Sequence, residues 1–205
     1  MDETTPPRER KMTDVATLRA RARRHIEEGA VTPGYTADRA EVVKLLNEAL
    51  ATEIVCTLRY RRHYFMARGI HAATVAAEFR EHADEELRHA VQIAERIVQL
   101  GGEPDFSPMT LLARSHAEYV EGKTLLDMIK ENLVAERVAI DSYREMLQHI
   151  AEDDPTTTRM LAAIDAFVDG INFWLDTNTF PQEVVDAGLH WRHWTRADVL
   201  AVGVV

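Results

Sequence analysis

Hydrophobic residues recur with the 3.6-residue period of an α-helix over four long stretches, and no stretch shows the alternation typical of a β-strand. The pattern predicts long helices over about residues 37–67, 71–100, 123–152 and 155–177. Gly101-Gly102 gives the second helix a typical C-terminal stop, and Pro155 stands in the first turn of the fourth. A shorter helix is predicted over about 13–28.

The connections between these helices predict how they pack. The first and third connections are short, whereas residues 101–122 form a long one that contains Pro104 and Pro108. Two helical hairpins joined by one long crossover form an all-α, antiparallel four-helix bundle. We therefore expect a basic N-terminal arm with a short helix (1–36), a bundle (37–177) and a C-terminal tail (178–205).

Polar residues interrupt the apolar stripes of three predicted helices at one depth. Glu53 lies about 16 residues before the first turn, and Glu86 and His89 lie about 17 and 20 residues after it. Glu136 lies at a comparable distance before the second turn. Because antiparallel helices rise equally per residue, we expect these four side chains to converge.

Carboxylates inside an apolar bundle need a counter-charge, because desolvating one unpaired ion costs several kcal/mol. A bound cation supplies it, and oxygen and imidazole ligands suit iron, manganese or zinc. A buried polar network is the alternative, since single glutamates on apolar stripes often snorkel or pair with arginine. His82, one turn before Glu86, is an accessory ligand or a hydrogen-bonded core histidine.

The first and third helices share an internal pattern, Glu53 to Tyr60-Arg61 and Glu136 to Tyr143-Arg144. Tyr60 is thereby a candidate for hydrogen bonding near the metal or for electron donation, with aromatic packing as the alternative. A true copy would place Glu-x-x-His on the fourth helix, but Val168 and Ile171 stand there. The site is thus predicted to be half complete, unless Asp165 or Asp169 turns inward.

Three segments of the chain resemble bacterioferritin and its relatives in the ferritin-like superfamily. They are Leu46 to Glu53, Glu86-Leu87-Arg88-His89-Ala90 and Asn132 to Glu136, within a likeness over about 37–177. The resemblance implies that Glu53 is a terminal ligand of one iron, Glu86 a bridge, His89 a ligand of the first iron and Glu136 a ligand of the second.

The same resemblance shows two departures. Val168 and Ile171 align with the family's second bridging glutamate and histidine, which implies weakened oxidation of paired iron. Leu87 stands where bacterioferritins place the methionine that binds haem, so no haem is implied.

Charge is unevenly distributed along the chain. The net charge of −10 argues against a nucleic-acid-binding body. Residues 8–25 nevertheless hold seven Lys and Arg against Glu9 and Asp14, so this arm is a weak candidate for DNA contact or simply a solvated helix. The end of the chain, Leu200 to Gly203, faintly resembles peptides that bind encapsulin shells.

The chain is expected to be cytoplasmic. Its one cysteine, Cys56, fits a reducing compartment, and its N-terminus is too polar for a secretory signal. No apolar run approaches the length of a membrane span.

Three functions follow as hypotheses. The first is an iron-oxidising and iron-storing protein in a homo-oligomeric cage of 12 or 24 subunits built from dimers. The second is a structural or regulatory relative that has lost the chemistry. The third is a DNA-protection protein that uses residues 8–25. The physiological metal and the cage size stay open at this stage.

Overall fold

The computed structural model describes residues 12–26, 31, 35–69, 72–151 and 153–165. The chain divides after residue 36 into two units. The first contains α1 (Val15–Arg24), a helix capped by Asp14 and without buried residues. The second contains α2 (Arg39–Met66), α3 (Ala72–Gln99), α4 (Leu111–Arg114), α5 (Leu125–Ile150) and α6 (Pro155–Asp165).

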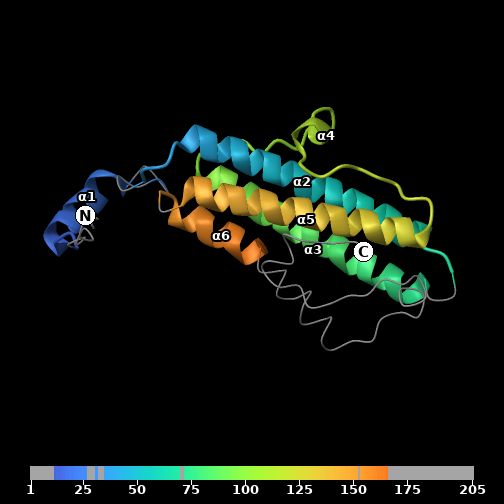
Figure 1. The fold of residues 1–205 in the computed structure, drawn as a ribbon. Helices are drawn as coiled ribbons and strands as arrows, with labels where there is room; N and C mark the ends of the chain where they lie inside the picture. Colours follow the sequence, from blue (N-terminus) through green and yellow to red (C-terminus); the bar gives the residue numbers. More distant parts are fainter. Residues whose placement is uncertain (1–11, 27–30, 32–34, 70–71, 152, 166–205) are drawn as a thin grey trace, which may run out of the picture. The chain divides into compact units, whose positions relative to one another are not determined.

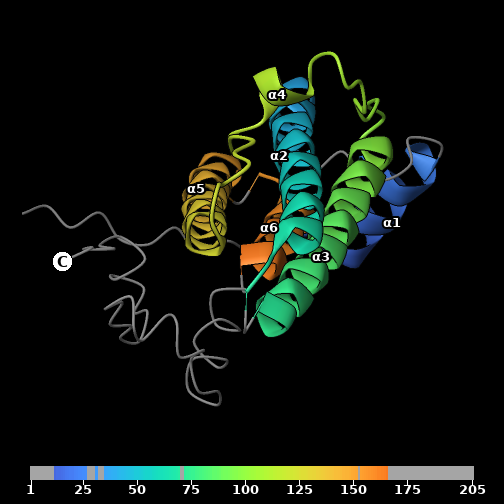
Figure 2. The same cartoon turned by 90° about the vertical axis from the view of Figure 1, so that its right-hand side faces the viewer.

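The second unit is a four-helix bundle, as the sequence pattern predicts. α2 packs against α3 and α5 packs against α6, while α2 also contacts α5 and α3 contacts α6. The segment between α3 and α5 runs the length of the bundle beside α2 and includes the short helix α4 (Figures 1 and 2). The order of two hairpins and one long crossover is therefore confirmed.

Local sequence signals explain where the helices end. Gly101 has a positive φ of 74°, and the amides of Gly101 and Gly102 donate to the carbonyls of Val98 and Ile97. This is a Schellman cap, which needs a left-handed residue after the helix. Thr124 and Asp127 form a capping box at the start of α5. The observed ends of α2, α3 and α5 and the start of α6 lie within about three residues of the predicted ones, whereas α1 ends at Arg24 rather than near residue 28.

Buried polar side chains fasten the crossover to the bundle. Arg59 is 1% exposed, and its guanidinium donates to the Asn132 side-chain oxygen and to the Glu118 carbonyl. The His63 ring contacts the carbonyls of Val120 and Glu121. The sequence pattern did not indicate this network, because an arginine or histidine between apolar residues reads equally well as a surface residue.

No helix in the described part of the chain is long and apolar enough to cross a membrane. α6 is described as far as Asp165, so the predicted continuation to residue 177 lies outside the described residues, as does the tail.

A buried ion pair joins the end of α3 to the start of α6. Arg96 donates to both carboxylate oxygens of Asp154 at 2.9 and 3.0 Å, and Asp154 also caps α6 through the Thr157 amide. Burial would raise the pKa of Asp154, but its bonds to Thr157 and Arg96 outweigh burial and lower it.

We expect Arg96→Ala to reduce the free energy of unfolding by about 3 kcal/mol, because it leaves the Asp154 carboxylate buried without its partner. Urea unfolding measures this change. Arg80→Ala, at an exposed site on the same helix, is the control and should change stability by no more than about 0.5 kcal/mol. Equal effects of the two substitutions would show that the pair does not stabilise the bundle.

Candidate metal centre

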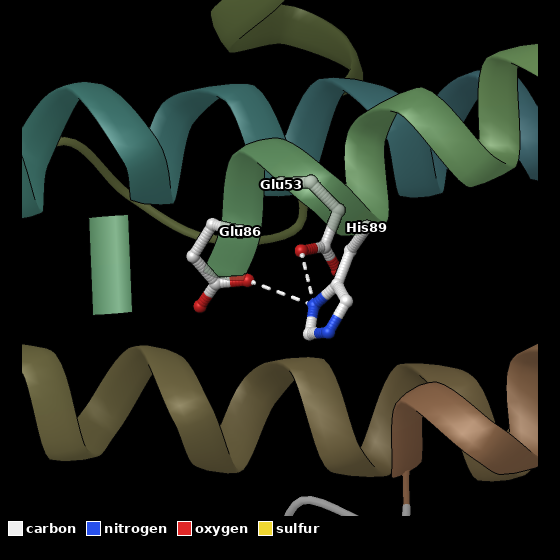
Figure 3. Close-up of side chains that lie close together, drawn as sticks. All are labelled: Glu53, Glu86 and His89. Carbon is white, nitrogen blue, oxygen red and sulfur yellow. Dashed lines mark hydrogen bonds and ion pairs between the residues drawn. The ribbon is translucent and has the colours of Figure 1, made fainter. Parts of the chain in front are cut away.

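Three side chains from two helices meet inside the bundle (Figure 3). Glu53 comes from α2, and Glu86 and His89 come from successive turns of α3. The His89 Nδ1 atom lies 3.3 Å from a Glu53 carboxylate oxygen and 3.4 Å from a Glu86 oxygen. One ligand atom from each residue lies within 4.8 Å of the others, a grouping found nowhere else among the described residues.

Because the cluster is buried, negative charge on its carboxyl groups is energetically unfavourable. Desolvation raises the pKa of Glu53 to about 7, opposed by a hydrogen bond with Glu86 and reinforced by the charge of Glu136. Desolvation also raises the pKa of Glu86 well above its usual range, and the charges of Glu53 and Glu136 act in the same direction. Without a cation, the Glu53 and Glu86 carboxyls therefore share a proton in the neutral pH range.

Glu136 of α5 lies beside this cluster and lines the same small cavity of about 20 Å³, which is large enough for one water-sized group. The other lining residues come from the same helices and from α6: Glu53, Glu85, Glu86, His89, Ala139, Ile140, Tyr143 and Ile164. All four candidate ligands thus face one cavity, although Glu136 is not part of the tight group of three.

Two tyrosines bind the carboxylates in a reciprocal arrangement. The Tyr60 hydroxyl of α2 donates to Glu136 of α5 at 2.5 Å, and the Tyr143 hydroxyl of α5 donates to Glu53 of α2. Each tyrosine therefore supports the glutamate of the other helix rather than that of its own. The sequence repeat shared by α2 and α5 therefore corresponds to a reciprocal pair of hydrogen bonds, in which the tyrosine of each helix binds the glutamate of the other.

We expect Tyr143→Phe to weaken cation binding about 10- to 100-fold, because it removes the hydroxyl that orients Glu53. Co(II) titration of the purified protein measures the affinity. Tyr119→Phe, on the crossover, is the control and should leave the affinity unchanged. Binding by Tyr143→Phe as tight as in the unaltered protein would remove the tyrosine from the site.

Several sequence predictions lie outside the described residues. Val168, Ile171 and Asp169 are among them, as are the residues proposed for encapsulin contact. α6 is described as far as the backbone of Asp165, so an inward turn of the Asp165 side chain stays a prediction. The suggested DNA contact by residues 8–25 stays a prediction, with the basic side chains of α1 exposed to solvent in the described part.

Sequence reasoning did not single out Glu85, which lines the cavity directly before Glu86. It also paired the tyrosines only with their own helices. The spacing of Glu85 from His82 and from His89, three and four residues, is the signal that could have found it.

The donor set suits a cation. Two carboxylates and one imidazole converge with no basic side chain among them, and a third carboxylate shares the cavity. Such oxygen and nitrogen donors favour divalent first-row transition metals. A cation would take the place of the proton that the carboxyls otherwise share.

Comparison with known proteins identifies one matching domain family and several similar bacterioferritins. Residues 43–168 match the ferritin-like domain family. Bacterioferritin from Desulfovibrio desulfuricans is 29% identical over 64% of this chain and 70% of its own length. Bacterioferritin from Mycobacterium avium is 28% identical over 59% of this chain and 72% of its own length.

Solved structures agree with the fold. The dodecameric thioferritin of Bacteroides fragilis, a bacterioferritin-related protein, matches with a TM-score of 0.61 and 30% identity, covering 63% of this chain and 78% of that one. The Dps protein of Bacillus brevis matches with a TM-score of 0.62 and 22% identity over 64% and 90% of the two chains, which is evidence for the fold alone. The helix order, the sequence match and the bacterioferritin relatives lead to one conclusion: the chain is a bacterioferritin-like member of the ferritin-like domain family.

Proposed function

We propose that the protein binds Fe(II) at Glu53, Glu86 and His89, oxidises it, and stores the product in a homo-oligomeric cage. The observation that supports this proposal most is the convergence of three potential ligand atoms within 4.8 Å at a buried position. The oxidant is dioxygen or peroxide, which accepts the electrons that Fe(II) loses. Iron is here the substrate and the stored product, and the chain's own residues bind and orient it.

Each residue has a distinct role in this proposal. Glu53 is held by Tyr143 and binds the first ion from α2, while Glu86 and His89 bind it from α3. Glu136, which accepts a hydrogen bond from Tyr60, offers a carboxylate to iron beside this first ion. Because the cluster is 2% exposed at Glu53 and about one-fifth exposed at His89, ions enter on the His89 side.

An aerobic assay tests the oxidation. Fe(II) added to the purified, metal-free protein should produce the ferric absorbance faster than buffer alone, and Glu53→Ala should reduce that rate to near the buffer rate. Glu41→Ala, which changes a partly exposed glutamate near the start of the same helix, should oxidise iron as the unaltered protein does. If the unaltered protein oxidises Fe(II) no faster than buffer, the proposed oxidation is wrong even where cations still bind.

Assembly is the second part of the proposal. α3 exposes Leu87, Val91 and Val98, an apolar row of the kind that soluble proteins bury against a partner. The dodecameric state named for the relative from Bacteroides fragilis supports a homo-oligomer. Light scattering on the full chain should give a species of 12 or 24 subunits, and a monomer at micromolar concentration would contradict storage in a cage.

A further inference from the structure

The helix α1 has no role in the function proposed above. It has ten residues, and none of them is buried. Asp14 caps it, since the Asp14 carboxylate accepts hydrogen bonds from the amide and the hydroxyl of Thr17. One cap is a small contribution for so short a helix, because isolated helices of fewer than about 12 residues are marginal in water. A surface against which α1 packs would supply the missing stabilisation.

One face of α1 is apolar. Val15, Leu18 and Ala22 are spaced three and four residues apart, so their side chains form one row along the helix. Val15 is 59% exposed and Leu18 is 45% exposed. Ile26, four residues after Ala22, is also exposed. An apolar row of this length that stands in water indicates a site of interaction rather than a solvated face.

Arginines border this row on both sides. Successive residues of a helix are turned by about 100°, which places Arg19 and Arg23 along one edge of the row. The same rotation places Arg21 along the other edge. α1 contains no acidic residue, so nothing within the helix neutralises these charges. A helix that is apolar on one face and basic along its edges has the character of helices that lie in the interface of a lipid bilayer.

The position of the arginines favours a lipid surface over a nucleic acid. Phosphates of DNA or RNA would bind arginines anywhere on the helix and would leave the apolar row in water. The boundary of a bilayer accommodates both kinds of side chain, because apolar groups enter the acyl region while guanidinium groups reach the headgroup phosphates. Arginines beside the row, rather than only opposite to it, stand at the level of those phosphates.

We propose that α1 binds the surface of an anionic lipid bilayer, with Val15, Leu18 and Ala22 in the acyl boundary and the arginines at the headgroups. The helix would lie in the plane of the surface. Ten residues of helix span about 15 Å, whereas the hydrocarbon core of a bilayer is about 30 Å thick. The iron site of the bundle takes no part in this contact, so the two functions are separable.

Charge should decide which lipids bind. Each arginine near an anionic surface contributes a factor of about five to the partition coefficient. Salt screens this attraction, because the Debye length falls from about 10 Å at 0.1 M salt to about 3 Å at 1 M. The apolar row adds a contribution that depends on the depth of insertion and not on salt.

Co-sedimentation of the full-length protein with vesicles tests the proposal. We expect the protein to sediment at low salt with vesicles of phosphatidylcholine and phosphatidylglycerol in equal parts, and not with vesicles of phosphatidylcholine alone. Leu18→Gln should reduce the partition coefficient at least fivefold, because it removes a side chain from the acyl boundary. Arg19→Gln should reduce it about fivefold.

Matched controls are available outside α1. Leu112→Gln changes an exposed leucine of the crossover, and Arg80→Gln changes an exposed arginine of α3. Both variants should bind the anionic vesicles as the unaltered protein does. Because no residue of α1 is buried, Leu18→Gln and Arg19→Gln should leave the circular dichroism of the bundle unchanged.

Several results would overturn the proposal. They are no binding to anionic vesicles at low salt, equal binding to the two kinds of vesicle, and binding by Leu18→Gln as strong as that of the unaltered protein. A gel shift of duplex DNA that Arg19→Gln weakens, in a protein that ignores the vesicles, would assign α1 to a nucleic acid instead.

Discussion

Glu86→Gln is expected to weaken cation binding severely while it stabilises the metal-free protein. The Glu86 carboxylate faces Glu53 and Glu136 inside the bundle, and burial and these charges raise its pKa. A neutral amide of the same shape avoids the cost of protonating this buried carboxyl on folding and should add about 1–2 kcal/mol to the free energy of unfolding at pH 8. Loss of a ligand should weaken Co(II) binding by more than about 100-fold, beyond the effect of losing a ligand's hydrogen-bond partner.

Two measurements on one protein check this expectation. Urea unfolding after chelation gives the stability, and calorimetry gives the affinity. Glu95→Gln, at an exposed position of α3, serves as the matched control for the loss of charge. A Glu86→Gln protein that binds Co(II) as tightly as the unaltered protein contradicts the assignment of Glu86 as a ligand.

The second large effect is a dependence of stability on pH. The pKa of Glu53 is about 7 in the folded protein against 4.5 for the free side chain. Between these values the folded state holds a proton that the unfolded state has released, so stability falls as the pH rises through this window. The difference corresponds to about 3 kcal/mol for Glu53 alone.

The comparison that isolates this effect uses Glu53→Gln, which has no proton to lose. The free energy of unfolding of the metal-free protein, relative to the variant, should decrease by about 3 kcal/mol between pH 4.5 and 7.5. Co(II) should reverse the trend, because it competes with the proton and binds better as the pH rises. A constant difference between protein and variant across this range would show that Glu53 is ionised without a cation.

The sequence predicted the bundle well because helical signals are local. Apolar periodicity marks the helices, and residues such as Gly101 and the Asp154-Pro155 pair mark where they end or begin. The ends predicted from these signals lie within a few residues of the observed ones. The convergence of Glu53, Glu86 and His89 was also predictable, since equal rise per residue in antiparallel helices fixes their depth.

Features that depend on how side chains cross between helices were not predictable in the same way. The exchange of Tyr60 and Tyr143 between the two glutamates depends on the rotation of α2 against α5, which periodicity does not specify. The buried Arg59 network depends on where the crossover lies, and a long loop has no repeating pattern to place it. The position of Glu85 in the cavity was not predictable from periodicity, because Glu85 lies beside the apolar stripe of α3 rather than within it.

Anomalous diffraction at the iron edge, on crystals soaked anaerobically with Fe(II), locates bound iron relative to the buried carboxylates. We expect an iron peak within bonding distance of Glu53, Glu86 and His89, and its absence in Glu86→Gln crystals. An iron-soaked crystal with no anomalous density among these three side chains, while they still face one another, would contradict the claim that the buried carboxylates exist to hold a metal cation.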